Sequence, residues 1–273
     1  MTFSFKSLYV IAICLLITSV VSAQNVDTFI YRAQSVRSVG FGFPSLNYSL
    51  LSSLNYSGYS FSFFSSRFRE KPKYLNQFRM QSQIGVLHNN ANDSYITTLG
   101  FNGGWSRHWH VADRAQPLRL LSGFGVDTGA SVYLKDENTN NPLAYFFNLS
   151  LSPNLLLKYC INTQKTRFEL GQQIEIPFFS LISSSDYSIT LPPGFFEEEA
   201  SFFDAMRLVS FGSMKKVVAI TTLDVTPSVE RREKMPVIRI TYFFSGLNYN
   251  NGDLTIKSVD HLILFGAIFH LFR

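Results

Sequence analysis

Apolar and polar residues alternate along several long segments of this chain. Between positions 95 and 110, the odd positions are mostly aromatic or apolar, whereas the even positions are mostly small and polar. Successive side chains of a β-strand point to opposite faces, so this period of two predicts a strand with one apolar and one polar face. At about 16 residues, the segment is far longer than a usual strand of about 5 to 6 residues.

The same alternation recurs in four further segments, at 76–88, 118–134, 166–178 and 238–245. Weaker patterns predict five more strands, near 35–43, 57–69, 143–160, 215–226 and 258–272. The chain is therefore expected to form about ten strands, with 8 to 12 possible if weak segments are merged or split.

The connections between these strands alternate in character. Asn-, Ser- and Gly-rich loops are expected near 44–56, 88–94, 135–142, 182–214 and 247–256, and mostly short turns near 70–73, 111–117, 161–165 and 227–235. Outer-membrane barrels have long outer loops and short periplasmic turns. The pattern predicts an all-β fold, an antiparallel up-and-down transmembrane β-barrel with both chain ends on the periplasmic side.

A secreted, soluble β-sandwich also alternates apolar and polar residues, with the apolar face inward. Three features favour the membrane barrel over the sandwich. The strands are too long for a sandwich, aromatic residues crowd the apolar face, and the other face carries Gln, Arg, Glu and Gly. The sandwich remains the alternative architecture.

The first 23 residues have the pattern of a secretory signal peptide. Lys6 supplies a positive charge, the apolar stretch from Leu8 to Val21 follows, and small residues precede Gln24. This stretch is short for a transmembrane helix, which needs about 20 apolar residues. We expect export with cleavage after Ala23, which leaves 24–273 as a single barrel domain in the outer membrane.

Composition limits the other function classes. Cleavage would remove Cys14, so Cys160 alone could form no intramolecular disulfide and a small stapled fold is excluded. Loss of Lys6 would lower the formal charge from +5 to +4. That balance favours contact with anionic lipid head groups but is too weak to indicate nucleic acid binding. Membrane lipid is therefore an expected partner, and nucleic acid is not expected as one.

The chain ends in VDHLILFGAIFHLFR, with Leu264, Ile268 and Phe272 on one parity. This segment resembles the closing strand of bacterial outer-membrane proteins, which ends in an aromatic residue after alternating hydrophobic residues. The resemblance implies a C-terminal barrel signal read by the barrel assembly machinery. The chain departs from the pattern because Arg273 follows and the other parity is also apolar, as in a strand buried in a soluble core. The Ser-Ala-Gln junction and the Asn- and Phe-rich barrel look like those of Bacteroidota.

The hexapeptide WSRHWH, at 105–110, holds both tryptophans and two histidines. Strand parity directs Trp105, Arg107 and Trp109 toward lipid, where aromatic residues form interfacial girdles and Arg extends to head groups. His108 and His110 would face the lumen. Two histidines can share a metal, but no further ligand is close in spacing, so neither a metal site nor a cofactor is expected.

Ten polar residues are expected to line the lumen: Arg79, Asn102, His108, His110, Arg119, Asp127, Arg167, Glu169, Glu175 and Arg239. They could form a selectivity lining for a small solute. They could instead form a plug of paired charges, because buried charges are tolerated when they are paired. A barrel of about ten strands lies near the filled end of the size range, which favours the plug.

The long outer loop 182–214 contains PPGFFEEEASFFDAMRLVSF. Acidic residues from Glu197 could begin a helix, with Phe196, Phe203, Met206 and Val209 on one face. Such a loop could be a lid, a constriction or a surface for a protein partner, or it could simply cap the barrel mouth.

These observations favour an outer-membrane barrel without catalysis, serving membrane structure, partner binding or narrow-solute passage. The alternative is a barrel hydrolase acting on lipid or peptide, because Ser106 and His108 share the lumen face with Asp127, Glu169 and Glu175. This match is by residue type alone, so no catalytic residue is assigned.

Overall fold

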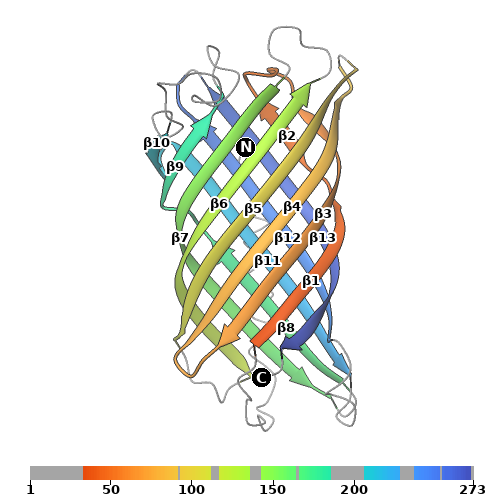
Figure 1. Cartoon of the computed structure of the whole chain (residues 1–273), viewed down its shortest axis with the longest axis vertical. Coiled ribbons are helices and arrows are strands. Elements are labelled where there is room, and N and C mark those ends of the chain that lie inside the picture. The colour runs from red at the N-terminus through yellow and green to blue at the C-terminus, as the bar shows by residue number, and fades with distance from the viewer. Residues whose placement is uncertain are drawn as a thin grey trace.

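The computed structural model describes residues 33–91, 93–111, 117–135, 143–163, 166–185, 206–227, 237–252 and 254–271. Within these ranges the chain forms one closed antiparallel barrel of steeply tilted strands (Figure 1). The predicted signal peptide, residues 1–23, lies outside the described residues. The described part of the chain holds no helix with the length and hydropathy needed to cross a membrane.

Thirteen strand segments lie within the described ranges: β1 Ala33–Gly42, β2 Ser45–Tyr48, β3 Tyr56–Glu70, β4 Tyr74–Asn89, β5 Ser94–His110, β6 Leu118–Lys135, β7 Leu143–Asn162, β8 Thr166–Glu175, β9 Phe179–Ser184, β10 Arg207–Ser210, β11 Met214–Pro227, β12 Val237–Asn250 and β13 Thr255–Leu271. β1 continues into β2, β8 into β9 and β10 into β11, each pair forming one interrupted barrel strand. The described chain thus forms a ten-stranded barrel, which confirms the predicted fold class.

Each barrel strand pairs with its neighbours along the chain, and the ring closes between the first and last strands. Val36 of β1 lies opposite Ile268 of β13, and the ladder extends over the whole of β1. Closure removes the unpaired edges that an open sheet would present to lipid or to other chains.

The interruptions in the barrel strands occur at prolines and at one turn. Pro44 separates β1 from β2, and Pro177 separates β8 from β9; proline cannot donate to a strand ladder. A turn at 211–213 separates β10 from β11. On the long-loop side of these breaks, β9 pairs with β10, while Met214–Val217 of β11 pairs with β12.

The predicted loop 182–214 is shorter in the structure than in the sequence-based expectation. β9 extends to Ser184 and β10 begins at Arg207, and Val209 lies opposite Ser180 in the ladder between them. The prediction that Val209 shares a helical face is therefore wrong, because its backbone is in a strand ladder. The expected helix start at Glu197 lies outside the described residues. Likewise, β2 occupies part of the predicted loop 44–56.

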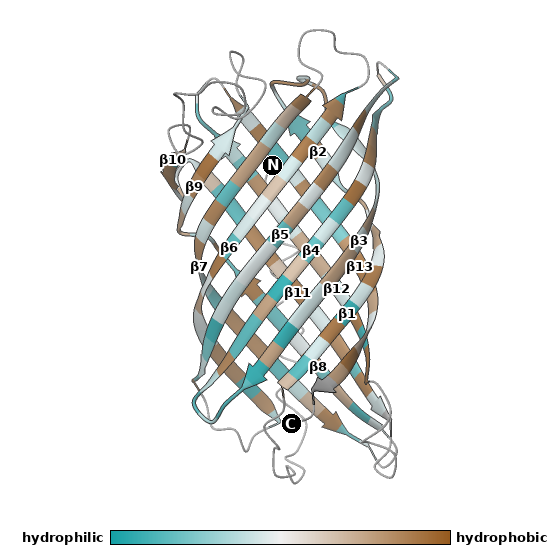
Figure 2. Ribbon diagram, in the orientation of Figure 1, coloured by the Kyte–Doolittle hydropathy of each residue, from teal (hydrophilic) through white to brown (hydrophobic). Residues whose placement is uncertain are grey.

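The exterior of the barrel is apolar and its interior is largely polar. Outward-facing residues include Phe41, Tyr59 and Phe265, whose exposed fractions are 66%, 75% and 56%. Apolar and polar residues alternate along most strands (Figure 2). This is the reverse of a soluble sandwich, whose outer face is polar, so the exposed surface excludes the sandwich alternative.

Candidate functional site in the barrel lumen

Side chains fill much of the lumen in layers between its two ends. At the end of the long loops lies an apolar group, here the mouth cluster, which contains Leu46, Tyr48, Leu51, Tyr133, Phe146 and Tyr249. Arg79 with Asp127 and Glu175 forms a second layer, here the Arg79 bridge. Near the short turns lies a third, the turn-end ionic cluster of Glu70, Arg119, Lys158, Arg167 and Glu169.

The mouth cluster is built on residues 45–56, here the mouth segment, which comprise the wall strand β2 and the turn that follows it at the loop end. Tyr48 carries the segment to the far wall, where its hydroxyl lies 3.1 Å from the carbonyl oxygen of Tyr145 and 3.2 Å from that of Ser185. Leu51 is almost fully buried in the same cluster. Tyr48 thus links β2 to the region of β7 and β9, which lie across the barrel from it.

Polar contacts hold the mouth segment to other strands. The Lys135 ammonium of β6 donates to the Leu51 carbonyl oxygen at 3.1 Å. At the end of the segment, the Tyr56 and Ser94 hydroxyl oxygens lie 2.7 Å apart. The first part of the segment, β2, is paired with β13 and β3 in the wall, and the residues after Tyr48 turn inward and pack their apolar side chains in the mouth.

The Arg79 bridge spans the lumen from β4 to the opposite wall. The Arg79 Nη1 atom donates to Glu175 Oε1 at 2.5 Å, and Nη2 donates to both Asp127 and Glu175. Gly104 leaves room for this arrangement, since a Cβ there would lie 2.1 Å from Asp127 Oδ1. One guanidinium thus joins three strands in the bidentate geometry that arginine favours with carboxylates.

The turn-end ionic cluster is organised around Glu169. Its carboxylate lies 3.0 Å from Lys158 Nζ and 3.2 Å from Arg119 Nη2. Arg119 also contacts Glu70 at 3.3 Å. The charges in this cluster are therefore paired, as the predicted plug requires.

A second ion pair near this end joins neighbouring strands. Arg239 of β12 donates from Nε and Nη2 to the two Asp224 oxygens of β11, both at 2.5 Å. The Arg239 guanidinium also lies 5.2 Å from the centre of the Phe68 ring. Together with the turn-end ionic cluster, this pair fills the lumen near the short turns.

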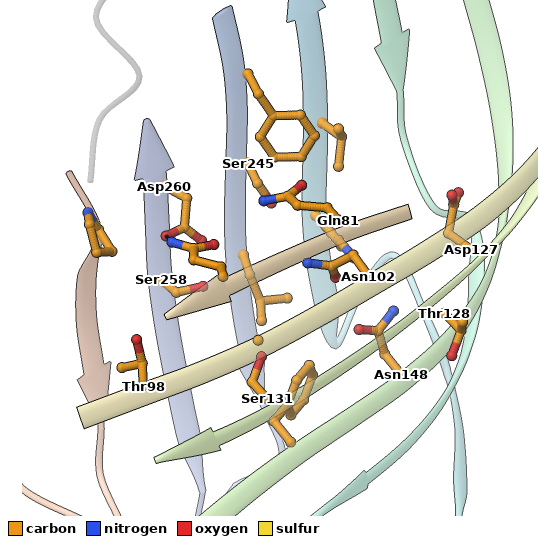
Figure 3. Close-up of a pocket in the computed structure, with 18 of the residues that line it drawn as sticks. Gln81, Thr98, Asn102, Asp127, Thr128, Ser131, Asn148, Ser245, Ser258 and Asp260 are labelled. Carbon is orange, nitrogen blue, oxygen red and sulfur yellow. Dashed lines mark hydrogen bonds between the residues drawn. The ribbon is translucent and has the colours of Figure 1, made fainter. Parts of the chain in front are cut away.

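A cavity of about 110 Å³ lies between the mouth cluster and the Arg79 bridge, with members of both in its lining. Side chains of Gln81, Asn102, Ser131, Asn148 and Asp260 converge on it from β4, β5, β6, β7 and β13 (Figure 3). A single water needs about 10–15 Å³ on this measure, so several waters or one small solute would fit.

The structure places all ten residues of the predicted polar lining on the inner face of the barrel wall, in alternation with outward neighbours. It brings Arg79, Asp127 and Glu175 together in the bridge and Arg119, Arg167 and Glu169 together near the turns. Asn102 lines the cavity, Arg239 pairs with Asp224, and His110 Nε2 lies 3.7 Å from Glu70.

His108 is buried on the inner wall together with Ser106. No hydrogen bond between these two side chains is found in the described structure, and its residues contain no group of three or more His, Cys, Asp or Glu side chains suited to a metal. Within the described residues, neither His108 nor His110 is thus placed beside a nucleophile or in a metal-binding group.

The predicted lipid girdle lies on the outer face of β5. Trp105 and Trp109 are each 44% exposed. Arg107 is only partly exposed, because its Nε donates to Asn76 Oδ1 at 2.9 Å and its guanidinium lies 4.5 Å from the centre of the Tyr74 ring. Contact of this group with lipid stays a prediction.

Two of the three residues in the predicted C-terminal barrel signal point into the lumen. Leu264 and Ile268 are fully buried among inward apolar side chains, and Phe272 lies outside the described residues. The opposite parity, with Ile263, Phe265 and Phe269, faces outward. The outward apolar face of this strand is therefore formed by the residues of the other parity, to which the sequence analysis gave no role.

Sequence reasoning missed several residues that shape the lumen, among them Tyr48, Lys216 and Asp260. Tyr48 lay in a predicted loop, and its reach across the barrel has no sequence signal. Strand parity was the available signal for the other two, since Lys216 shares its face with Val218, and Asp260 with Leu262. Both lie near the ends of weakly patterned strands, where parity is hardest to assign.

Comparison with protein-family models matches residues 8–273 to the family described as "Protein of unknown function (DUF3316)". The chain belongs to the DUF3316 family. Comparison of this DUF3316 chain with curated proteins gave no match.

Solved structures similar to this DUF3316 protein are outer-membrane proteins. The outer-membrane protease OmpT from Escherichia coli aligns with a TM-score of 0.50 and 7% identity, covering 90% of this chain and 99% of that chain. The translocator domain of the autotransporter NalP from Neisseria meningitidis gives a TM-score of 0.45 and 7% identity over 90% of each chain. The β-domain of the Bordetella autotransporter BrkA gives a TM-score of 0.43 and 9% identity, covering 88% of this chain and 100% of that chain. At this identity the likeness to OmpT shows the barrel fold alone.

Proposed function

We propose that this DUF3316 protein is a non-catalytic barrel of the outer membrane that passes small polar solutes through a lumen closed at rest. The polar cavity beneath the mouth segment carries this proposal. A barrel that served membrane structure alone could fill this space with packed side chains, as small barrels do. Here the lumen instead keeps a cavity whose lining includes carboxamides, hydroxyls and charged groups beside apolar side chains.

Outer-membrane location, export by cleavage of residues 1–23 and insertion through the C-terminal strand are parts of the same proposal. The exposed aromatic and aliphatic residues around the barrel support the membrane location, because an apolar band of this kind is unfavourable in water. The likeness of the fold to OmpT supports it as well. Membrane structure and partner binding at the outer loops are the competing roles.

The mouth segment and the paired charges support a closed resting state. Passage toward the cavity requires the mouth segment to move, and passage beyond it requires the Arg79 bridge and the turn-end ionic cluster to rearrange. We therefore expect slow, size-limited permeation rather than the steady current of an open porin.

Swelling of proteoliposomes in solutions of single uncharged solutes tests the proposal. Vesicles with the wild-type protein should swell faster than protein-free vesicles in a pentose such as arabinose, and no faster in a trisaccharide such as raffinose. Planar bilayers should record brief, infrequent openings.

Heat-modifiable gel mobility provides the control, because it reports whether the barrel is folded. A folded protein that swells vesicles no faster than the protein-free control in any solute would overturn solute passage and favour membrane structure or partner binding. Swelling in raffinose equal to that in arabinose would also contradict the narrow path.

A further inference from the structure

The charged side chains that line the cavity do not balance. Among the described residues these are Arg79 and Lys216 on the positive side, and Asp127, Glu175 and Asp260 on the negative side. With every group ionised, the cavity carries one surplus negative charge. An uncompensated charge away from bulk water is unfavourable, so the lumen favours a cation.

Lys216 balances one of the two carboxylates in the Arg79 bridge. Arg79 contacts both Asp127 and Glu175 and can balance only one of them. Val218 lies opposite Glu175 in the β8–β11 ladder, which places Lys216 diagonally beside Glu175 on the same inner face. Diagonal neighbours are within reach of a long side chain.

Asp260 is the remaining negative group. Within the described ranges no Lys, Arg or His nitrogen lies within 4.0 Å of its carboxylate, whose hydrogen-bond donor is the Gln83 amide at 3.4 Å. Two strand spacings, roughly 10 Å, separate β13 from β11, which carries Lys216. Asp260 therefore presents a carboxylate to the cavity without an ion pair among the described residues, and Lys216 acts on it electrostatically only from beyond 4.0 Å.

The groups around Asp260 suit an ammonium ion that also carries a hydroxyl group. Ser258 lies on the same face of β13, and Ser245 lies opposite Asp260 in the ladder with β12 (Figure 3). Ammonium has three N–H donors and no acceptor, so it needs several oxygen acceptors close together. The carboxamides of Gln81 and Asn102, which can both donate and accept, supply partners for a hydroxyl group.

We propose that the cavity binds a small organic cation, a primary ammonium with a hydrogen-bonding hydroxyl group, through Asp260. This inference rests on the proposed function, because it names the class of solute that the lumen favours. Asp260 would hold the ammonium, Ser245 and Ser258 would accept further hydrogen bonds, and Arg79 and Lys216 would keep the other two carboxylates balanced.

Equilibrium dialysis of the full protein in detergent micelles tests the site, with ethanolamine as the probe. Ethylene glycol replaces its ammonium with a hydroxyl group, and glycolate carries a negative charge instead. We expect ethanolamine to bind at least tenfold more tightly than either. Asp260→Asn should weaken ethanolamine binding at least tenfold, and Ser245→Ala should weaken it about threefold.

Asp93→Asn is the matched control, because Asp93 is an exposed carboxylate in an outer loop and its removal should leave binding unchanged. The heat-modifiable gel mobility of Asp260→Asn should match that of the wild type, which shows that the variant is folded. If Asp260→Asn does not fold, the binding measured for Ser245→Ala tests the site instead. Equal binding of the three probes, unchanged binding by Asp260→Asn, or full displacement by an equal concentration of potassium ions would overturn the proposal.

The two proposals fail in distinguishable ways. Ethanolamine binding without vesicle swelling would remove solute passage and keep the cation site. Vesicle swelling without preference for ethanolamine would keep passage and remove the site.

Discussion

Arg79 shows how a single side chain can organise the interior of this barrel. Its guanidinium contacts carboxylates from β6 and β8, and all three side chains are largely buried. Removing one partner of a buried ion pair leaves an uncompensated charge, which costs more than the pair contributes when intact. The integrity of the lumen should therefore be more sensitive to loss of Arg79 than to loss of any exposed arginine.

Arg79→Met should lower the free energy of unfolding by about 3–5 kcal/mol, because Glu175 and Asp127 then lose their shared cation. Adding Glu175→Gln in the same chain should restore part of that loss. Guanidinium titration of the refolded protein measures both effects. Arg69→Met, at an exposed position on β3, is the control and should change stability by less than about 0.5 kcal/mol. Equal effects of Arg79→Met and Arg69→Met would show that the bridge is not structural.

The mouth segment is the element that distinguishes this barrel from a simple ring of strands. It follows the interruption at Pro44, and its apolar residues turn inward toward Tyr133, Phe146 and Tyr249. The sequence predicted a loop here because Asn, Ser and Leu alternate without a clear strand period. It could not predict that the segment begins as the wall strand β2 and then packs its apolar side chains into the mouth, since that packing depends on residues such as Tyr145, 97 positions away.

Tyr48→Ala should loosen the mouth segment, because it removes a buried ring and its contacts with the Tyr145 and Ser185 carbonyl groups. Truncation of a large buried aromatic side chain costs about 3–5 kcal/mol. In a Cys160→Ser background, Asn148→Cys in the cavity wall should react with a water-soluble maleimide at least tenfold faster when Tyr48→Ala is present. Tyr59→Ala, which removes an exposed outward ring, is the control and should leave the rate unchanged. A rate unaffected by Tyr48→Ala would mean that the segment does not limit access to the cavity.

At the scale of the whole molecule, alternation predicted two-faced strands, and strand length together with the aromatic apolar face and the polar opposite face distinguished the barrel from a sandwich. Segments such as 95–110 set the strand faces, and the side chains of Arg79, Asp127 and Glu175 point inward as their parity requires. Parity indicates whether a side chain faces the lumen or the exterior. It does not give the position of that side chain along the barrel axis or its partner across the lumen. The Arg79 bridge therefore could not be predicted from sequence, since it depends on strand tilt and on the stagger between strands.

The last strand shows a different limit. Both of its faces are apolar, so its sequence alone does not fix which face meets lipid. The inward face packs Leu264 against Phe64, Val218 and Phe243, a local apolar group within a mostly polar lumen. This apolar group was not predicted, because the clearest alternating segments, such as 95–110, have mostly polar residues on the parity that faces inward.

The central claim is that small solutes pass through the lumen and that the mouth segment controls their entry. Reversible tethering tests it most directly, with Leu51→Cys and Lys135→Cys in the Cys160→Ser background joined by a short, reducible crosslinker. These two positions are close enough for a short crosslinker, since the Lys135 side chain reaches the Leu51 carbonyl oxygen. Arabinose-driven swelling should fall at least tenfold on tethering and recover after reduction, while Leu51→Cys alone should not respond to the crosslinker. Equal swelling of tethered and reduced protein would contradict the claim.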